Sequence, residues 1–422
     1  MPLKMSGTEA IVPPSQPSPS PGPVSASQHA SGSAQVAETL ATSGARPPAS
    51  GGLADVPHAA TATRDEFIDL VRAGSLLVVV IWHWVFTILV WHADGPHASN
   101  PIGRTSGAWV LTWVFQVMPA FFFVGGFVHY GLWNRAKTKG TSAITFFRDR
   151  LVRLLIPAFA LIAVIWVLKT ILQAVYPDVE WFGRAFILVI SPLWFLAVYV
   201  LVVLTVPTMV WLHERFGIIV PVLLAAIAVW VDVLRFKEGI DWVAWINMLA
   251  VWLFVHQLGF FWPQLKAMSR HTQWALMLGG FLALSALTNL GLYPRSMVGV
   301  PGERISNMAP PTVCIAALAI GQIGLLLLIR PGVIQRMERP RWRRFISFAS
   351  SYSMGIFVWH AMGFAILVGL LRLGGWDVPQ TDSWQWWAQR PLFLLAPIAT
   401  TAPLVLAFRP FESLGQRAKS AR

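Results

Sequence analysis

The sequence predicts an all-α polytopic membrane protein with about ten transmembrane helices and with its N- and C-termini in the cytoplasm. Of its 422 residues, 55% are hydrophobic and only 12% are charged, whereas about a quarter of the residues of an average soluble domain are charged. The apolar residues occur in uncharged runs long enough to cross a bilayer, and basic residues cluster between alternate runs. These observations exclude a soluble protein.

The net charge of +13 also needs an explanation, since a strongly basic soluble protein often binds nucleic acid. Here the basic residues form short clusters between the apolar runs instead of lining one face. Such clusters are typical of membrane topology. We therefore expect a lipid bilayer, and no nucleic acid, as a partner of this chain.

The composition divides the chain into three segments. Residues 1–63 are rich in Pro, Ser, Ala, Gly and Thr and contain few large apolar residues, so they cannot bury enough surface to offset the entropy of ordering. We predict a disordered cytoplasmic tail there, without a secretory signal. Residues 64–410 are predicted to form one ten-helix membrane domain, and residues 411–422 a short basic cytoplasmic tail.

The predicted spans follow from the length of each apolar run, because a helix needs about 20 residues to cross the bilayer. They are 69–91, 109–132, 153–175, 193–211, 217–234, 242–262, 274–292, 312–330, 347–371 and 391–408.

The basic residues set the predicted orientation, since basic loops stay in the cytoplasm. With ten spans and a cytoplasmic N-terminus, 23 of the 32 basic residues lie in cytoplasmic loops and tails. Lys169 lies near the outer end of the third span and can extend to the interface. The sequence thus predicts a multi-pass protein of the cell membrane, whether inner or plasma membrane. The eight basic residues left outside are Arg104, Arg184, Arg235, Lys237, Arg295, Arg304, Arg372 and Arg390.

Two histidines are the main candidates for chemistry, because polar side chains at membrane depth persist mainly for a role or a partner. His83 follows Arg72 by eleven residues, or about 16 Å of helix, which predicts a position near the bilayer middle. His360 is expected at a similar depth, so the two imidazoles could share a cavity. A neutral imidazole there could act as a general base, or it could simply hydrogen-bond to a neighbouring helix.

The other polar candidates are more typical of structural residues. His256, His129, His92 and His97 are interpreted as packing or loop histidines, and the single cysteine, Cys314, as a packing residue. The sequence contains no HExxH motif, no Walker loop and no Cys/His cluster. We therefore expect no metal.

Arginines at the start of the third span form a candidate phosphate site. The segment FFRDRLVRLLIP carries Arg148, Arg150 and Arg153, and the last two share one helix face at i, i+3 spacing. Guanidiniums bind phosphate in a bidentate manner. The positive-inside rule alone would also place basic residues here, so both interpretations stay open.

Together these segments resemble the acyltransferase 3 family of integral membrane acyltransferases, in an order that covers most of residues 64–409. The chain differs from the family pattern at Gly125, where the family often has Ser, and the second span supplies no carboxylate to serve as a partner for His83. The matching elements are the first helix with Asp69, Arg72 and His83, FFFVGGF at 121–127, the RxxR-type segment ending LLIP at 157, PLWFLAVYVL at 192–201 and SYSMGIFVWH at 351–360.

The resemblance implies transfer of an acyl group, often acetyl, from cytoplasmic acyl-CoA to a hydroxyl of a cell-envelope carbohydrate or glycolipid. In that scheme His83 is the catalytic base, with His360 beside it. Arg150 and Arg153, with Arg148, would hold the phosphates of CoA. Direct transfer and an acyl-histidine intermediate both fit these residues.

Two other classes of function remain as alternatives. A transporter or flippase for a lipid-linked or glycan substrate could use the histidines as a proton relay, but such proteins commonly carry carboxylates within the membrane. Here the acids near the spans lie at span ends, as Asp69 and Asp232 do. A sensor or scaffold without chemistry would give the deep histidines no task.

Overall fold

The computed structural model describes residues 65–376 and 378–420. The tail predicted for residues 1–63 lies outside these residues. Within them the chain is mainly helical, as expected, and nine helical segments are long and apolar enough to cross a membrane. The protein is therefore an all-α, multi-pass membrane protein.

The long helices lie close to the predicted spans. They are α1 (Glu66–Phe86), α3 (Met118–Thr138), α4 (Ala143–Val175), α6 (Trp194–Phe216), α7 (Ile219–Lys237), α8 (Asn247–Phe260), α10 (Arg270–Asn289), α11 (Val313–Met337), α12 (Pro340–Leu373) and α14 (Arg390–Ser420).

Short elements connect the long helices. They are the strands β1 (Ile88–His92) and β2 (Gly95–Ser99), the helices α2 (Trp109–Phe115), α5 (Phe182–Ile190), α9 (Trp262–Ala267) and α13 (Trp384–Ala388), and the 3-10 turns η2 (Pro101–Gly103), η3 (Ser191–Leu193) and η4 (Asp241–Ile246).

The predicted span 274–292 corresponds to α10, which is not among the nine because polar residues occupy both of its ends. Its position nevertheless agrees with a tenth crossing. The segment before it lies at the start of α1, where Lys266 is 3.6 Å from Asp65. The segment after it contacts α2, just before α3 begins, where the amide of Met297 donates to the Thr112 hydroxyl at 2.9 Å.

Side-chain caps fix the starts of several helices. Asp65, Ser142, Ser269 and Thr312 each accept a hydrogen bond from a backbone N–H in the first turn of α1, α4, α10 and α11. These bonds satisfy amides that have no partner within the helix. The residue types that cap soluble helices therefore mark helix starts in this membrane domain too.

The predicted first span, 69–91, is wrong at its C-terminal end. Helix α1 ends at Phe86, Thr87 has an extended backbone, and β1 then pairs with β2 as an antiparallel hairpin in which Ile88 lies opposite Ser99. The β-branched and aromatic residues of β1 suit a strand as well as an apolar helix. Pairing with β2 decides between them.

The predicted second span, 109–132, is interrupted. Helix α2 ends at Phe115 and α3 begins at Met118, with Pro119 in its first turn. A proline disfavours helical conformation in the residue before it and removes an amide donor. The side chain of Gln116 compensates by accepting from the Met118 amide at 3.3 Å.

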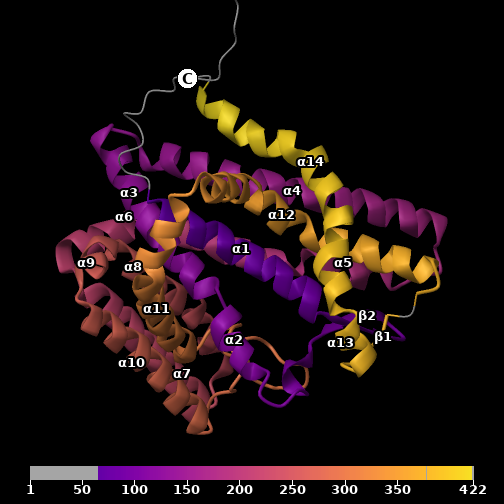
Figure 1. Cartoon of the computed structure of the whole chain (residues 1–422), viewed down its shortest axis with the longest axis horizontal. Coiled ribbons are helices and arrows are strands. Elements are labelled where there is room, and N and C mark those ends of the chain that lie inside the picture. Colours follow the sequence, from indigo (N-terminus) through magenta and orange to yellow (C-terminus); the bar gives the residue numbers. More distant parts are fainter. Residues whose placement is uncertain (1–64, 377, 421–422) are drawn as a thin grey trace, which may run out of the picture. The chain divides into compact units, whose positions relative to one another are not determined.

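Helix α1 passes through the middle of the molecule. In Figure 1 it runs diagonally, with α7, α8, α10 and α11 gathered to its lower left and the hairpin and α13 at its lower right. It packs against α12 and α3, while α10 packs along α11 and α14 along α12. Residues of α1 therefore face both halves of the bundle.

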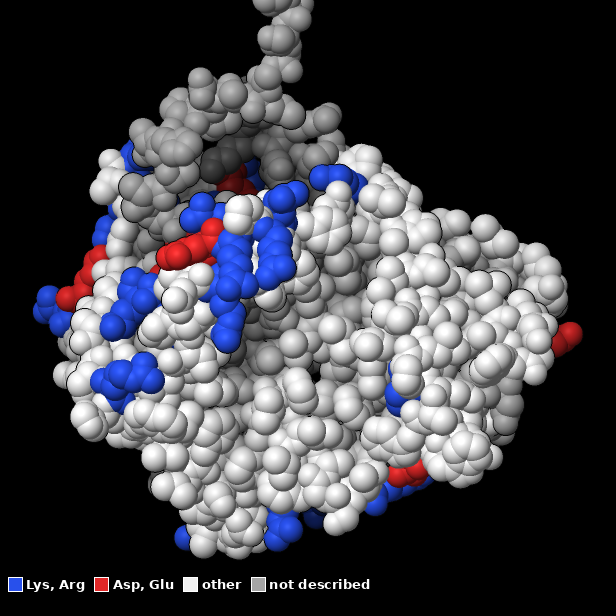
Figure 2. Space-filling model, viewed as in Figure 1, with Lys and Arg blue, Asp and Glu red and all other residues white. Residues whose placement is uncertain are grey.

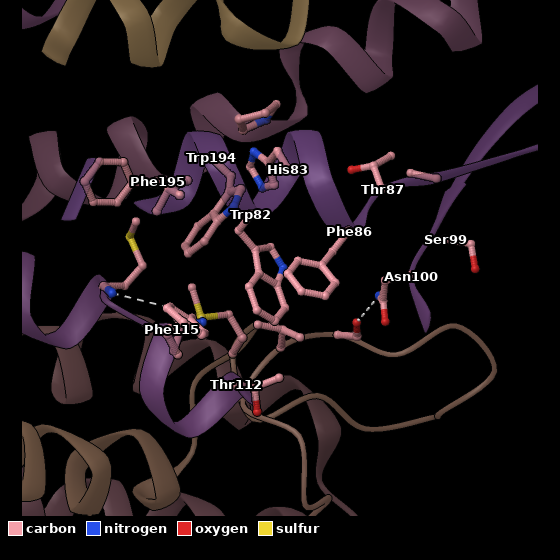
Figure 3. Close-up of a pocket in the computed structure, with 18 of the residues that line it drawn as sticks. Trp82, His83, Phe86, Thr87, Ser99, Asn100, Thr112, Phe115, Trp194 and Phe195 are labelled. Carbon is pink, nitrogen blue, oxygen red and sulfur yellow. Dashed lines mark hydrogen bonds between the residues drawn. The ribbon is translucent and has the colours of Figure 1, made fainter. Parts of the chain in front are cut away.

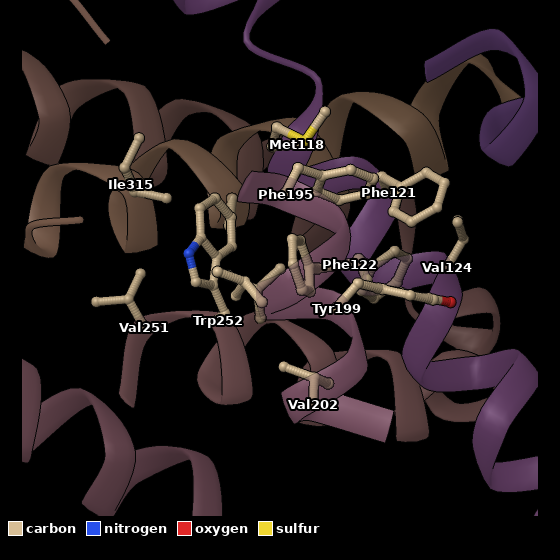
Figure 4. Close-up of a cluster of buried hydrophobic side chains, with 14 of the residues drawn as sticks. Met118, Phe121, Phe122, Val124, Phe195, Tyr199, Val202, Val251, Trp252 and Ile315 are labelled. Carbon is tan, nitrogen blue, oxygen red and sulfur yellow. The ribbon is translucent and has the colours of Figure 1, made fainter. Parts of the chain in front are cut away.

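An aromatic cluster fills the core between α3, α6 and α8 (Figure 4). Phe122 stacks on Trp252 with ring centroids 4.5 Å apart, and Phe121 meets Phe195 edge to face at 5.0 Å. Such pairs stabilise beyond the area they bury. They hold α3 and α6, which carry polar residues described below, in fixed positions.

Helices α3 and α8 cross at two glycines. A Cβ on Gly126 would clash with the carbonyl of His256 and lie 3.3 Å from the Cα of Gly259. Small residues allow helices to approach this closely in membranes. The second glycine of the FFFVGGF segment therefore allows the close packing of α3 on α8.

Charged residues gather at the two ends of the molecule. On the face in Figure 2, Lys and Arg side chains cluster at the upper left, and a broad uncharged surface separates them from smaller charged groups at the lower and right edges. Where α1 begins, Arg330 lies 3.9 Å from Asp65 and Arg343 lies 3.9 Å from Glu66. The uncharged surface is what a bilayer requires.

Candidate active site

The structure brings the two predicted histidines into direct contact. The Nδ1 of His83, on α1, lies 2.7 Å from the Nε2 of His360, on α12. Their rings are nearly parallel, with an interplanar angle of 14°. Residues 277 positions apart in the chain thus form one hydrogen-bonded pair.

The backbone carbonyl of Phe357 determines which nitrogen atoms of this pair carry a proton. The Nδ1 of His360 lies 2.5 Å from the carbonyl oxygen of Phe357, and a carbonyl can only accept. His360 therefore carries its proton on Nδ1 and accepts on Nε2, so the Nδ1–H of His83 donates to it. The Nε2 of His83 keeps a free lone pair.

That nitrogen belongs to a side chain that lines a cavity of about 300 Å³ (Figure 3). His83 is half-buried, whereas His360 is completely buried and lies behind it. In Figure 3 the indole rings of Trp82 and Trp194 lie on the cavity side of His83. His83 can meet a ligand here, and His360 can act only through His83.

His83 lies in the last turn of α1, three residues before Phe86, because α1 ends earlier than the predicted first span. The cavity accordingly lies at the end of the bundle where the hairpin and the 298–308 loop segment contribute lining residues.

Arg390 fixes the end of α1. It is 6% exposed, donates from Nη1 to the carbonyl of Val85 at 3.2 Å and from Nε to that of Trp386 at 2.9 Å. Its guanidinium lies 3.9 Å from the centroid of the Trp386 ring. A cation at the C-terminal end of a helix is favourable, so Arg390 restrains the turn that carries His83. No pattern in the sequence singles out Arg390.

Polar side chains also hold the loop that forms one wall of the cavity. Gln116 donates to the carbonyl of Met297 at 3.1 Å. Tyr293 donates to the carboxylate of Asp232 at 3.2 Å. Burial, together with this carboxylate, raises the pKa of Tyr293 above its usual value, so the phenol stays a donor across physiological pH. The wall is therefore anchored at several points.

Two of the three predicted arginines lie in a cluster with a third arginine, Arg72, that was not predicted to belong to the site. Arg150 and Arg153, on α4, and Arg72, on α1, all lie within electrostatic range of the Tyr199 hydroxyl. Arg148 instead faces Asp149, at 3.5 Å. Of the RxxR-type segment, the structure therefore groups the i, i+3 pair with Arg72 and leaves Arg148 exposed.

A second histidine pair lies near this cluster, within the core. The Nδ1 of His129 is 3.0 Å from the Nε2 of His256, and the Nε2 of His129 is 3.3 Å from the hydroxyl of Tyr199. Both histidines are buried, and neither lines the cavity described above. Each residue was visible as a histidine within a span, but the sequence carried no signal for their contact.

The remaining predicted histidines lie in the hairpin. His92 and His97 meet edge to face at 4.6 Å, and His97 also bonds to Asp94 at 2.9 Å. This hydrogen bond, helped by Arg184, holds the pKa of Asp94 below its usual value. The contact of Asp94 with Arg184 ties the hairpin to α5.

No carboxylate contacts His83 among the described residues, and the same part of the chain contains no cluster of three or more His, Cys, Asp or Glu that could hold a metal. The orienting partner of His83 is thus a second imidazole. A hydrogen-bonded donor–acceptor chain of this kind suits proton transfer at the free nitrogen.

Comparison with known proteins adds one finding. The family model of the acyltransferase 3 group, an acyltransferase domain, matches residues 65–406. No curated protein and no solved structure matches the chain. The matched residues include α1 through most of α14, and so both histidine pairs and the arginine cluster.

Proposed function

Since this chain belongs to the acyltransferase 3 family, we propose that it is an O-acyltransferase of the cell membrane, whether inner or plasma membrane. It would move an acyl group, acetyl or another short chain, from cytoplasmic acyl-CoA to a hydroxyl of a cell-envelope carbohydrate or glycolipid. Membership of the family supports an acyltransferase. The donor, the acceptor and the residue roles are our proposal.

The observation that carries the proposal is the free Nε2 of His83. Its Nδ1–H is bound to His360, whose own proton is bound to the Phe357 carbonyl. The ring is therefore held with its basic nitrogen unengaged, in a side chain that lines a cavity. A base that takes a hydroxyl proton during attack contributes about 10² to 10⁴ in rate.

The arginine cluster supports binding of the donor. CoA is polyanionic, and Arg72, Arg150 and Arg153 would hold its phosphates through charge-assisted hydrogen bonds. Arg72 and His83 lie on one helix, eleven residues apart, which is about 16 Å of rise. The extended pantetheine arm of CoA could span this distance, with the phosphates at the arginine cluster and the thioester at His83.

The transfer step follows from these positions. The acceptor hydroxyl gives its proton to the Nε2 of His83 while its oxygen attacks the thioester carbonyl carbon. The carbon–sulfur bond then breaks, and the imidazolium returns the proton to the CoA thiolate. In a two-step path, Nε2 attacks the thioester carbon and the CoA thiolate leaves; the acceptor hydroxyl then attacks the acyl-imidazolium, the carbon–nitrogen bond breaks, and the hydroxyl proton passes to the thiolate. Accumulation of acyl-His83 would distinguish the second path.

The charge distribution supports an assignment of sides. Basic residues gather at the end where α1 begins (Figure 2), and such loops face the cytoplasm. The cavity lies near the opposite end of α1. The donor would then arrive from the cytoplasm and the acceptor from the outer side.

The test is a transfer assay on the full-length protein in lipid nanodiscs, with labelled acetyl-CoA and lipid extracts of the cell envelope. We expect a labelled, alkali-labile product from the wild type and a rate at least 100-fold lower from His83→Ala. His92→Ala, which removes an exposed histidine of the hairpin, is the matched control and should keep the rate.

Two results would count against the proposal. Wild-type transfer by His83→Ala would remove the base from the mechanism. Movement of an envelope lipid across the nanodisc or vesicle membrane without any acylated product would favour the transporter alternative.

A further inference from the structure

We infer that the acceptor group that enters the cavity is an uncharged sugar ring, without a carboxylate, phosphate or amine. This inference rests on the proposed function and narrows its acceptor. It comes from the chemistry of the cavity wall, which differs sharply from that of the arginine cluster.

None of the residues that line the cavity is Asp, Glu, Lys or Arg. His83 is the one lining residue that can ionise near neutral pH, and it must be neutral to act as a base. A carboxylate or phosphate would therefore lose its hydration without meeting a cation. Burying an unpaired charge in this way is strongly unfavourable.

Several charged residues of the surrounding loops pair with one another. Arg104 lies 3.6 Å from Asp382, and Asp94 pairs with both Arg184 and His97. These pairs tie the loops together, and none of their members lines the cavity. An ammonium could gain from the indole faces, but it would sit beside the nitrogen that becomes an imidazolium, with no carboxylate to separate the two positive charges.

The available polar groups are neutral. Thr87, Ser99, Trp82 and Trp194 line the cavity, and among the described residues their hydroxyl and indole N–H groups have no hydrogen-bond partner. Asn100 is already committed, because it donates to Gly299 at 2.9 Å and accepts from Ile102 at 3.1 Å. Free hydroxyl and N–H groups suit the hydroxyls of a sugar.

The apolar part of the wall suits the carbon–hydrogen face of a ring. Trp82 stacks on Phe86 with centroids 4.3 Å apart and lies 6.2 Å from Phe115. The volume of about 300 Å³ is at the small end for ligand sites. It fits one ring with its hydroxyl at His83 better than an oligosaccharide.

The experiment compares matched glycosides in the nanodisc assay. Alkyl glucosides, mannosides and galactosides are each tested with two partners, the uronic acid and the uronamide. The uronamide also lacks the 6-hydroxyl but carries no charge, so it isolates the effect of charge. We expect kcat/KM to be on the order of 100-fold lower for each acid than for its amide. Amino sugars should be similarly poor beside their N-acetyl forms.

Two variants test whether the cavity causes this preference. Ser99→Lys places an ammonium in the wall and should raise the acid-to-amide ratio at least tenfold. Ala93→Lys adds the same charge at the exposed turn of the same hairpin, outside the cavity, and should leave the ratio unchanged.

Each outcome has a defined meaning. Equal rates for acids and amides, a preference for amino sugars, or no response to Ser99→Lys would overturn the inference while the acyltransferase function stands. Absence of transfer to every glycoside and every envelope lipid would overturn the proposed function as well. Mass spectrometry of envelope lipids from a deletion strain and its parent gives an independent check, because the missing acyl group should map to a neutral sugar.

Discussion

The two histidine pairs of this protein have similar bonds and different surroundings. In both pairs an Nδ1 faces an Nε2, at 2.7 Å in the His83–His360 pair and at 3.0 Å in the His129–His256 pair. In the first, the free Nε2 belongs to a side chain that lines a cavity. In the second, the Nε2 of His129 is bonded to Tyr199, and both imidazoles lie in the core.

The comparison shows that a buried imidazole is not enough to indicate a catalytic site. A base needs an unengaged nitrogen and space for the group that loses the proton. The first pair has both, whereas the second fills its bonding capacity with protein atoms, apart from the Nδ1 of His256, which is buried without a partner among the described residues. This difference supports the chemistry proposed for the first pair and favours a structural role for the second.

The largest expected difference is between the acyl-transfer rates of two glutamine variants, one in each histidine pair. His83→Gln should lower the rate by about 10² to 10⁴, because an amide cannot take up the proton. His256→Gln should keep the rate per folded molecule within a few-fold. Both rates are measured in nanodiscs and normalised to folded protein. Equal losses would show that the two pairs share one function.

Replacing the orienting member of the first pair should have the next largest effect. His360→Leu removes the acceptor for the Nδ1–H of His83, so the ring loses its fixed tautomer and orientation, and we expect kcat to fall by roughly 10- to 100-fold. His360→Gln offers an amide oxygen in its place and should retain more activity than the leucine variant.

A merely structural role for His360 would give a different pattern. Leucine and glutamine would then be equally active once corrected for folding, or KM would change with kcat unaltered. Comparison of kcat and KM for both substrates therefore separates orientation of His83 from general support of the fold.

The sequence predicted much of the fold because its signals are local. The uncharged runs predicted the helices, and the basic clusters predicted the charged ends of the bundle. The similar depth of His83 and His360, counted along two helices, allowed a shared cavity, and helix packing brings them into contact. The hairpin was not predicted. Residues from Ile88 onward form a strand because they pair with β2, and the apolar content of a segment does not distinguish such a strand from a helix.

The parts of the site that were missed depend on tertiary contacts. Arg390 lies 305 residues from the Val85 carbonyl that it binds, and Arg72 joins Arg150 and Arg153 only through helix packing. His129 and His256 looked like separate packing histidines, and their contact comes from the glycine crossing of α3 and α8. The residue type alone indicated that a histidine could act as a base, whereas its contacts in the folded protein distinguish a catalytic from a structural histidine.

In the buried pair, the expected effect is on stability. His129→Leu removes the partner of both His256 and Tyr199 and leaves two buried polar groups unsatisfied, at about 1–3 kcal/mol each. We expect a clearly lower thermal midpoint in detergent and an unchanged rate per folded molecule. His271→Leu, at an exposed site in the first turn of α10, is the control and should leave the midpoint unchanged.

The smallest expected effect is that of Tyr199→Phe, and it tests the boundary between the two regions. Only one bond of 3.3 Å is lost, so the destabilisation should be about 0.5–1.5 kcal/mol. Tyr130→Phe, whose hydroxyl has no hydrogen-bond partner among the described residues, is the control. Tyr199 also lies near Arg72, Arg150 and Arg153. If Tyr199→Phe raised the KM for acyl-CoA without a loss of stability, the His129–His256 pair would belong to the donor site and its role would not be only structural.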